Sequence, residues 1–570
     1  MRRISGIPVS EGIVIGKVLL FQKESQKTEK RILREEEVQE ETERFEKAVS
    51  ATVEQIKQLY KTAKEKLGEE EAEIFAAHLS VAEDPMIAEG VCEKIRGNQV
   101  NAEHALEETL EEIGQMFSAM SDEYLRERAA DVKDVGKRIM DCLTGNAAVD
   151  LSHLPYPCII AANDLSPSET VTMDFSKTLG FVTESGGRTS HTAILSRALE
   201  IPAVVGTGAG FQEIKDGDMV ILDARSGDIF IDPQQEHLDL YKKKQEEYQQ
   251  EKDALMQLKS LPGETLDKHR VELCANIGNP ADARRVLPHG AEGIGLYRTE
   301  FLYMDNADFP SEEEQFEAYK EVAALMDGRP VIIRTLDIGG DKELPYFEFE
   351  KEENPFLGWR AIRICLDRTD VFKTQLRAIL RASAFGNLRI MYPMIISVEE
   401  LKRANELLQE CKEELKEEGK EFDAGIMAGI LVETPAAVVM ADELAKYADF
   451  FSIGTNDLCQ YTLAVDRGNV KIADKYNPFH PAVLRNIKHV IDAAHRQGKF
   501  VGMCGEFAGD ERATVLLLGL GLDEFSMTAV QIPKVKKKIR SLNMGTAEIF
   551  AKKALEAETV KEIEELIQQV

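Results

Sequence analysis

One short segment of the chain carries the residue types of a histidine nucleophile that handles phosphate. Residues Gly186–Thr192 read Gly-Gly-Arg-Thr-Ser-His-Thr, so His191 follows two glycines and an arginine and lies among three hydroxyls. An apolar run at Leu179–Thr183 predicts a strand before it, and Ala193–Leu199 predicts the start of a helix. Glycines permit close backbone approach, amides at a helix start favour an anion, and Arg188 adds a permanently charged phosphate partner. The segment fits a phosphoryl-accepting histidine, and it fits equally well a capped helix start with an incidental exposed histidine.

Polar and reactive residues also follow several strand candidates in the second half of the chain. They occur at Tyr297–Glu300, at Arg334–Asp337, at Glu433 and Thr434, at Gly454–Asp457 with Arg467 ten residues on, and at Cys504–Glu506. Glu433 and Asp457 offer hard oxygen ligands of the kind that Mg²⁺ or Mn²⁺ prefers. Arg298, Arg334 and Arg467 predict a clamp for an anion that carries both carboxylate and phosphate, because guanidinium groups match both.

Cys504 adds a proton donor to this set. A thiol with an unperturbed pKa of about 8.5 is mostly protonated at neutral pH, so Cys504 can serve as a general acid toward a carbon atom. A buried, inert thiol is the alternative. Each arginine or acid taken alone is more typical of a surface residue or a structural ion pair, whereas their joint placement after corresponding strands favours a site.

The elements that must position these residues alternate between strand and helix. The eight strand candidates are Val271–Cys274, Gly293–Leu296, Val331–Arg334, Arg389–Tyr392, Ile426–Val432, Phe450–Ile453, Phe500–Met503 and Glu524–Met527. Most of the segments between them are long enough for a helix. Eight such units in about 300 residues predict a (β/α)8 barrel, whose active sites gather at the carboxyl ends of the strands. An open doubly wound sheet is the alternative.

The first half of the chain has a different organisation. Residues 5–21 and 150–233 contain short apolar runs between turn residues, which indicates an α/β segment. Between them, Lys30–Asn146 has few prolines and long amphipathic patterns, which predict a bundle of helices inserted into that segment. Gln234–Lys259 lacks glycine and proline and predicts a connecting helix that Pro262 ends.

Charge and composition exclude several classes of function. The formal charge of -31 argues against a nucleic-acid partner, because phosphates reward basic grooves. Residues 31–150 hold 15 Lys and Arg against 29 Asp and Glu, a bias that fits either a solvated helical surface or a docking face for a basic protein. No apolar run approaches the roughly 18 residues of a membrane-spanning helix. The eight cysteines form no C-x-x-C pair, so we expect free thiols in a cytoplasmic protein that binds no membrane.

The motifs together resemble those of enzyme I of the bacterial phosphoenolpyruvate-dependent sugar phosphotransferase system. Gly186–Thr192 is similar to the phosphohistidine signature of that family, Glu292–Phe301 to a phosphoenolpyruvate-site segment, and Gly502–Glu506 to its acid loop. Phe451–Leu458 and the pair Asp466-Arg467 fit as well. The resemblance covers essentially the whole length.

The resemblance implies a fold and a set of domains. The expected class is a multidomain α/β protein with a phosphohistidine α/β domain, an inserted helical bundle, a linker helix and a C-terminal (β/α)8 barrel. The expected boundaries are 1–22 with 147–233 for the phosphohistidine domain, 23–146 for the bundle, 234–261 for the linker helix and 262–570 for the barrel.

The resemblance also implies a reaction. Phosphoenolpyruvate is expected to give its phosphoryl group to His191, the enolate to take a proton from Cys504, and pyruvate to leave. Mg²⁺, or Mn²⁺ in its place, is expected on Glu433 and Asp457. Substrate binding is assigned to Asp457 together with Arg298, Arg334, Asn456 and Arg467, and supporting roles to Thr170, Arg188 and Arg360.

The implied acceptor is the phosphocarrier protein HPr, docked on the inserted bundle. Glu69, Glu70 and His78 lie in the stretch that matches the docking helix of the family. This favours the docking interpretation of the acidic bias, as a surface that steers a basic patch. The family is also expected to form a homodimer through the barrel domain.

Three other classes share parts of these motifs. Phosphoenolpyruvate synthase and pyruvate phosphate dikinase are similar around the histidine and in the barrel, but they need a large nucleotide-grasp domain, and Lys30–Asn146 has no glycine-rich phosphate loop. The nitrogen-related paralogue carries an additional N-terminal sensory domain. A non-catalytic adaptor is disfavoured, because His191, Cys504, both acids and all three arginines occur together.

Overall fold

A computed structural model describes the chain in two compact units, Met1–Glu251 and Lys252–Val570. The described residues are all of 1–570 except 22–29, 67–68, 119–122, 145–150, 152–153, 166–168, 170–172, 188–189, 200, 305, 307, 341, 343, 345, 348, 351, 470 and 570. The description also excludes the side chains of residues 62–66, 69, 70–74, 76, 85, 115–118, 123–131, 133, 191, 194 and 198.

An eight-stranded sheet forms the α/β part of the first unit, in the order β1-β8-β7-β3-β4-β5-β6-β2. Its strands are β1 (Arg2–Ser5), β2 (Ile7–Ser10), β3 (Ile13–Phe21), β4 (Cys158–Ala162), β5 (Thr178–Thr183), β6 (Ala203–Val205), β7 (Met219–Asp223) and β8 (Asp228–Ile231). Strands β3, β4, β5 and β6 run parallel, and the other pairings are antiparallel. The predicted strands at residues 158–162 and 179–183 are confirmed. The remaining elements are α7 (His191–Ala198) and the 3-10 helix η2 (Gly208–Glu213).

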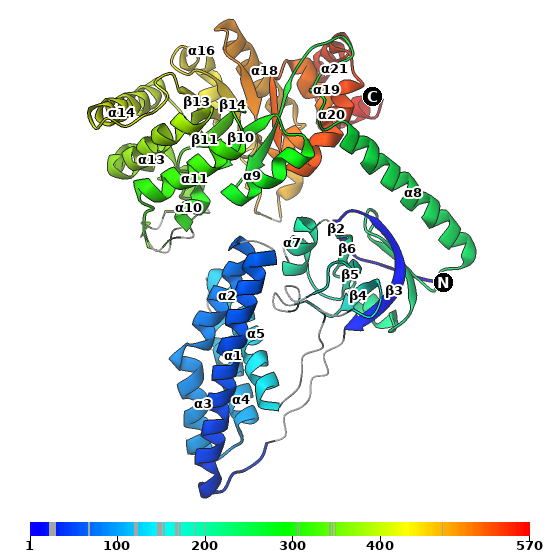
Figure 1. The fold of residues 1–570 in the computed structure, drawn as a ribbon. Helices are drawn as coiled ribbons and strands as arrows, with labels where there is room; N and C mark the ends of the chain where they lie inside the picture. The colour runs from blue at the N-terminus through cyan, green and yellow to red at the C-terminus, as the bar shows by residue number, and fades with distance from the viewer. Residues whose placement is uncertain are drawn as a thin grey trace. The chain divides into compact units, whose positions relative to one another are not determined.

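A bundle of long helices lies between β3 and β4 in the sequence (Figure 1). After a short 3-10 turn, η1 (Glu35–Glu37), it comprises α1 (Val38–Lys66), α2 (Glu69–Ala82), α3 (Pro85–Asn98), α4 (Ala102–Ser118) and α5 (Glu123–Thr144). Buried apolar residues such as Phe45, Ile56, Val91 and Ile139 form its core. The insertion predicted from the amphipathic pattern is therefore confirmed. The charged helix that follows the sheet is α8 (Gln235–Gln257), which contains the division between the two units.

The second unit contains a closed barrel of eight parallel strands, so the open-sheet alternative is excluded. The strands are β9 (Glu272–Ile277), β10 (Gly293–Arg298), β11 (Val331–Arg334), β12 (Leu388–Tyr392), β13 (Met427–Val432), β14 (Phe451–Ile453), β15 (Val501–Met503) and β16 (Glu524–Met527). Each overlaps one of the eight predicted strands. They were predictable because a parallel strand covered on both faces is an almost continuous apolar run.

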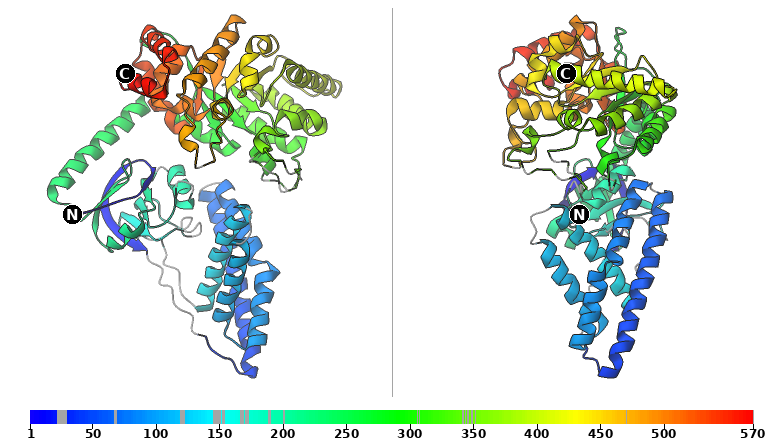
Figure 2. Two further views of the ribbon diagram at one scale, coloured as in Figure 1. Left: turned by 180° about the vertical axis from the view of Figure 1, so that it is seen from behind. Right: turned by 90° about the vertical axis from the view of Figure 1, so that its left-hand side faces the viewer.

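Helices surround the barrel, as both views of Figure 2 show. They are α9 (Pro280–Val286), α10 (Glu300–Met304), α11 (Glu312–Leu325), α12 (Ile362–Asp367), α13 (Thr369–Ala382), α14 (Val398–Glu417), α15 (Pro435–Val439), α16 (Ala441–Leu444), α17 (Thr455–Leu463), α18 (Pro481–Arg496), α19 (Glu511–Leu520), α20 (Ile532–Arg540), α21 (Met544–Glu556) and α22 (Val560–Ile567). Short 3-10 turns supplement them at η3 (Leu287–His289), η4 (Pro355–Leu357), η5 (Ser383–Phe385), η6 (Ala473–Lys475), η7 (Glu506–Gly509) and η8 (Ala529–Gln531).

Two apolar layers hold the barrel together. The larger one packs strand residues such as Leu273, Ile333 and Phe525 against the surrounding helices. The smaller one fills the barrel interior and includes Leu296, Met391, Leu431 and Phe450. Side chains inside the barrel therefore form a packed core and not a pore.

Candidate active site

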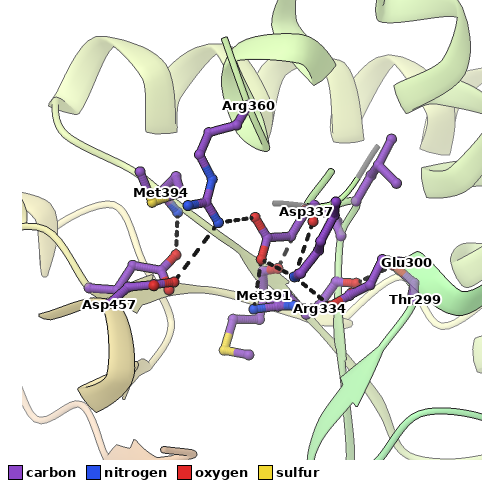
Figure 3. A network of polar contacts seen from close by, with 12 residues as sticks. Thr299, Glu300, Arg334, Asp337, Arg360, Met391, Met394 and Asp457 are labelled. Carbon is purple, nitrogen blue, oxygen red and sulfur yellow. Dashed lines mark hydrogen bonds and ion pairs between the residues drawn. The ribbon is translucent and has the colours of Figure 1, made fainter. Parts of the chain in front are cut away.

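A buried network of charged side chains lies at the carboxyl end of β11 (Figure 3). Arg334 ends this strand, and its guanidinium donates to Glu300 at 2.5 Å and contacts Asp337 at 3.0 Å. Lys342 bridges the same two carboxylates, at 2.8 Å from Glu300 and 3.0 Å from Asp337. Arg360 donates to the other oxygen of Asp337 at 2.9 Å. Three cations therefore share two carboxylates.

The carboxylates of this network are held in the ionised form. Burial by itself would raise the pKa of Asp337, but Arg334, Lys342 and Arg360 outweigh it and hold that pKa well below its ordinary range. Burial likewise opposes ionisation of Glu300, and Arg334 with Lys342 lower its pKa all the same. Both acids are almost fully buried. The network thus keeps fixed charges in a region of low dielectric, where they act more strongly than in water.

A second pair of carboxylates lies at the ends of β13 and β14. Glu433 follows β13, is 1% exposed, and accepts a hydrogen bond from the backbone amide of Met394 at 2.7 Å. Burial, followed by the charge of Asp457, raises the pKa of Glu433 to about 8. Asp457 lies in the first turn of α17, where one of its oxygens is 3.9 Å from Arg360 and the other has no hydrogen-bond partner among the described residues.

This pair fits a hard divalent cation. Two close, buried carboxylates repel each other, and an unpartnered oxygen in such a place needs a proton or a cation. The missing side chain of Gly454 leaves the space for Glu433, since a Cβ there would approach a carboxylate oxygen to 2.9 Å. Carboxylates completed by substrate oxygens are typical ligands of Mg²⁺.

Backbone strain accompanies these residues. Met394, which donates its amide to Glu433, has a φ of +56°, and Ala361, next to Arg360, has a φ of +52°. Residues other than glycine seldom adopt this conformation, and it concentrates at functional sites when the surrounding contacts enforce it.

Cys504 follows β15 and faces the barrel interior. It packs with Leu296, Met391 and Leu431, and its exposure is 6%. Burial raises the pKa of the thiol to about 12. Its carbonyl accepts a hydrogen bond from the Asn276 amide at 2.9 Å, which fixes the backbone at this position. The thiol is therefore protonated throughout the neutral range, as a proton donor must be.

The other two predicted arginines differ from Arg334. Arg298 ends β10 and is exposed, with its guanidinium 5.5 Å from the ring centre of Phe301. Arg467 is exposed as well, and its backbone amide donates to Gln460 at 3.2 Å. Asn456 accepts from the backbone amide of Glu506 at 3.3 Å. Arg334 is buried and held by carboxylates, whereas Arg298 and Arg467 face solvent. The two exposed side chains can therefore move toward an anion more easily than Arg334.

The histidine segment lies in the first unit. His191 is the first residue of α7, and Ser190 caps that helix by accepting from the amide of Ala193 at 3.4 Å. Gly186 has a φ of +105°, and a Cβ there would come within 3.1 Å of the Ser190 hydroxyl. The predicted helix start is therefore confirmed. Arg188 and Thr170 lie outside the described residues, and the side chain of His191 is outside the description too.

Comparison with known proteins matches nearly every part of the chain. The family model described as PEP-utilising enzyme, PEP-binding domain, matches residues 252–544, the one described as PEP-utilising enzyme, N-terminal, matches 5–128, and the one described as PEP-utilising enzyme, mobile domain, matches 154–227. A phosphoenolpyruvate-protein phosphotransferase of Haemophilus influenzae is 50% identical, over 99% of this chain and 98% of its own length. Proteins of the same name from a Bacillus species and from Geobacillus stearothermophilus are 49% identical, over 99% of this chain and 97% of theirs. The chain belongs to the phosphoenolpyruvate-protein phosphotransferase family. It is an enzyme.

The structure brings together most of the predicted phosphotransferase residues of the barrel. Five of them are close enough for their charges to interact, because each perturbs the pKa of at least one other. They are Arg334, Arg360, Glu433, Asp457 and Cys504. Their roles in the reaction stay predictions.

Three members of the buried charge network received no role from the sequence. Glu300 and Asp337 belong to the polar segments that follow predicted strands. The spacing of Arg334 and Asp337, three residues apart after a strand, could have indicated their ion pair. Lys342 had no such signal: it lies five residues after Asp337, and its other partner, Glu300, is 42 residues away.

The structure describes one of the residues predicted to dock HPr. His78 is fully buried within α2, where its ring packs edge-on against Phe75 and its Nδ1 lies 3.7 Å from Asp134. The side chain therefore supports the bundle from within, and its part in docking stays a prediction. Glu69 and Glu70 begin α2, and their side chains lie outside the description.

Within the described residues of this phosphotransferase, every helix is too short or too polar to span a membrane.

Proposed function

We propose that this enzyme transfers the phosphoryl group of phosphoenolpyruvate to His191 and then to the phosphocarrier protein HPr, releasing pyruvate. Family membership supports the reaction class. The observation that carries the assignment of the site is the convergence, at adjacent strand ends, of a carboxylate pair and a buried, protonated thiol. A donor site for phosphoenolpyruvate needs both a place for a cation and a proton for the enolate.

The barrel mouth binds the substrate in this proposal. Glu433 and Asp457 hold Mg²⁺, or Mn²⁺ in its place, and the cation supplies charge neutralisation for the phosphate and enolate oxygens. Arg298 and Arg467 close on the anion from solvent, and Asn456 contributes its amide. Arg334 presents its charge from a fixed position, because Glu300 and Asp337 hold it.

The chain's own groups then carry the reaction. Nε2 of His191 forms a bond to phosphorus while the bond from phosphorus to the enol oxygen breaks. The enolate takes the thiol proton of Cys504 at its terminal carbon and leaves as pyruvate, and the thiolate later recovers a proton from solvent. Arg188 and Thr170 support the histidine, and Arg360 supports the mouth through Asp337.

The domain and partner assignments belong to the same proposal. The histidine domain comprises residues 1–22 and 147–233. The helical bundle, residues 23–146, docks HPr through Glu69 and Glu70. The linker helix, residues 234–261, joins these parts to the barrel, residues 262–570, which binds the substrate and forms a homodimer. His191 and Cys504 belong to different units, so the histidine must reach the barrel mouth in one step and HPr in the next. The expected location is the cytoplasm.

The test is phosphorylation of the purified chain by radiolabelled phosphoenolpyruvate. We expect acid-labile label in the presence of Mg²⁺, none after chelation, and none in His191→Ala. Label that survives in His191→Ala would refute the assignment of the nucleophile. A requirement for ATP would instead indicate a synthase or dikinase, and a lack of label under every condition would indicate a non-catalytic paralogue.

A further inference from the structure

Three potential metal ligands converge inside the barrel, at the end opposite to the mouth. Glu272 begins β9, Cys274 follows two residues later on the same face, and Glu524 begins β16. The two strands pair in register, with Glu524 opposite Glu272. One ligand atom from each of the three side chains lies within 4.8 Å of the others. The cluster includes no residue of the proposed active site.

Glu524 is the unusual member of this cluster. Its side chain is 1% exposed, and neither carboxylate oxygen has a hydrogen-bond partner among the described residues. Burial, followed by the charge of Glu272, raises its pKa to about 7. A buried carboxylate that lacks both a hydrogen bond and a counter-ion is costly. The arrangement therefore has an electrostatic reason to take up a cation.

The neighbouring strands leave room around these ligands. A Cβ added to Gly295 of β10 would lie 2.2 Å from an oxygen of Glu524, and one added to Gly502 of β15 would lie 3.1 Å from the same oxygen. A Cβ added to Gly293 would come within 3.1 Å of the Cys274 sulfur. Glycines on both flanking strands thus keep side chains away from the ligands.

The positive charge of Arg389 opposes the uptake of a metal cation by this cluster. Arg389 of β12 lowers the pKa of Glu524, and its guanidinium lies 5.0 Å from the ring centre of Phe500. Its Nε has no hydrogen-bond partner, and no ion pair within 4.0 Å joins it to Glu524 in the described part of the chain. Arg389 therefore offsets the charge of Glu524 only in part and forms no ion pair with it among the described residues.

We propose that Glu272, Cys274 and Glu524 form a binding site for a thiophilic divalent cation, with Zn²⁺ as the natural occupant. One thiolate and two carboxylates suit Zn²⁺, whose ligands lie at about 2.0–2.3 Å, and a water reaching the site past the partly exposed Glu272 completes a tetrahedron. Mg²⁺ does not take thiolate ligands, so this site and the carboxylate pair at the mouth select different metals. On binding, the sulfur-to-hydrogen bond of Cys274 is replaced by a bond to the metal, and the proton goes to solvent.

The site has a structural consequence for the barrel. Strands β9 and β16 are the first and last strands, and their pairing closes the cylinder. A metal that links both strands stabilises the closed form, because it binds the folded chain and finds no preformed site in the unfolded one.

The test uses Cd²⁺ alone as the probe, on the full chain under reducing conditions, because thiolate ligation of Cd²⁺ produces a charge-transfer absorption in the ultraviolet. The charges of Glu433 and Glu524 also act on Cys504, so this thiol could provide a second ligand for Cd²⁺. Every variant in the test, including the reference protein, therefore carries Cys504→Ser. We expect one Cd²⁺ per chain with the thiolate band, loss of the band on adding Cys274→Ser, and at least tenfold weaker binding on adding Glu524→Gln. Zn²⁺ is expected to displace the Cd²⁺ and to raise the urea midpoint of the barrel.

The matched control is Cys365→Ser, which removes an equally buried thiol of α12 and should leave the titration unchanged. A band that is absent from the Cys504→Ser protein, or that survives Cys274→Ser, would overturn the proposal. Glu524→Gln has the shape of the protonated side chain and is expected to fold. Unchanged Cd²⁺ affinity in that variant would overturn the proposal independently of the cysteine substitution.

Discussion

Replacing Asp337 by asparagine tests whether the buried charge network stabilises the barrel. Asp337 is 1% exposed and contacts Arg334, Lys342 and Arg360 at 2.9–3.0 Å. Asparagine preserves the volume but removes the charge. Glu300 continues to pair with Arg334 and Lys342, whereas Arg360 keeps a hydrogen bond to the Tyr461 hydroxyl at 3.2 Å and, among the described carboxylates, only Asp457 at 3.9 Å. Removing one partner of a buried ion pair costs about 3–5 kcal/mol, and we expect a loss in that range.

The assay is urea unfolding followed by tryptophan fluorescence. The chain has a single tryptophan, Trp359, which lies in the barrel unit beside Arg360 and packs against Phe347 and Phe349. Its emission therefore reports on the barrel unit. The control is Asp370→Asn, which breaks an exposed pair with Arg368 at 2.8 Å and should cost well under about 1 kcal/mol.

The pH dependence gives a second readout with a defined sign. The folded pKa of Asp337 lies well below the unfolded value of about 3.9, so its stabilisation is complete above that value and is lost as the pH falls through it toward the folded pKa. The comparison is made in a Glu433→Gln background, because Asp337 also helps to raise the pKa of Glu433. There the difference made by Asp337→Asn should be constant from pH 7 to pH 5.5 and should shrink by about 0.7 kcal/mol at pH 3.5. A loss no larger than that of Asp370→Asn, or a difference that grows at acid pH, would refute the reasoning.

Three further predictions concern the reaction, the stability of the barrel and the partner. Cys504→Ser should reduce steady pyruvate release by about 10²–10⁴-fold, because a hydroxyl is a weaker acid than a thiol, and an equal loss in Cys365→Ser would contradict this role. Gly505→Ala should destabilise the barrel by at least about 1–3 kcal/mol in urea unfolding, because its Cβ would lie 1.7 Å from the Thr455 hydroxyl; Gly545→Ala, in α21 with no heavy atom within 4 Å, should be neutral or slightly stabilising. Charge reversal at Glu69 and Glu70 should slow phosphoryl transfer to HPr at low ionic strength and lose most of its effect at high salt. The same reversal at the exposed pair Glu246 and Glu247 of α8 is the control, and a similar slowing there would show that net charge and not a docking face is responsible.

The sequence was sufficient to predict the strands of the barrel and the polar residues at their ends. Barrel strands such as Val331–Arg334 and Glu524–Met527 have the predicted limits, because apolar runs between turns survive as buried parallel strands. Their polar final residues could be assigned to one mouth by the geometry of the fold alone.

Side-chain environments could not be predicted in the same way. Arg334 was expected to be available to an anion, but two carboxylates from separate segments hold it. His78 lies on an amphipathic helix among acids, and only the packing of α2 against its neighbours shows that the ring faces inward. Glu524 follows Asp523 in what resembles a polar turn, although strand alternation directs its carboxylate into the barrel. Each outcome depends on how the elements pack in three dimensions, which the local sequence pattern does not show.

The place at which the helical bundle enters the sheet has a consequence for how such enzymes diversify. Strands β3 and β4 are parallel neighbours, and Lys17–Phe21 pairs with Cys158–Ala162. Two adjacent parallel strands always need a crossover connection, which is usually a single helix of about a dozen residues. Here the whole bundle serves as that crossover. A change in its length, its helices or its surface leaves the strand order unchanged, so the part of the chain that we propose to dock a protein partner can vary without any change to the pairing of β3 with β4.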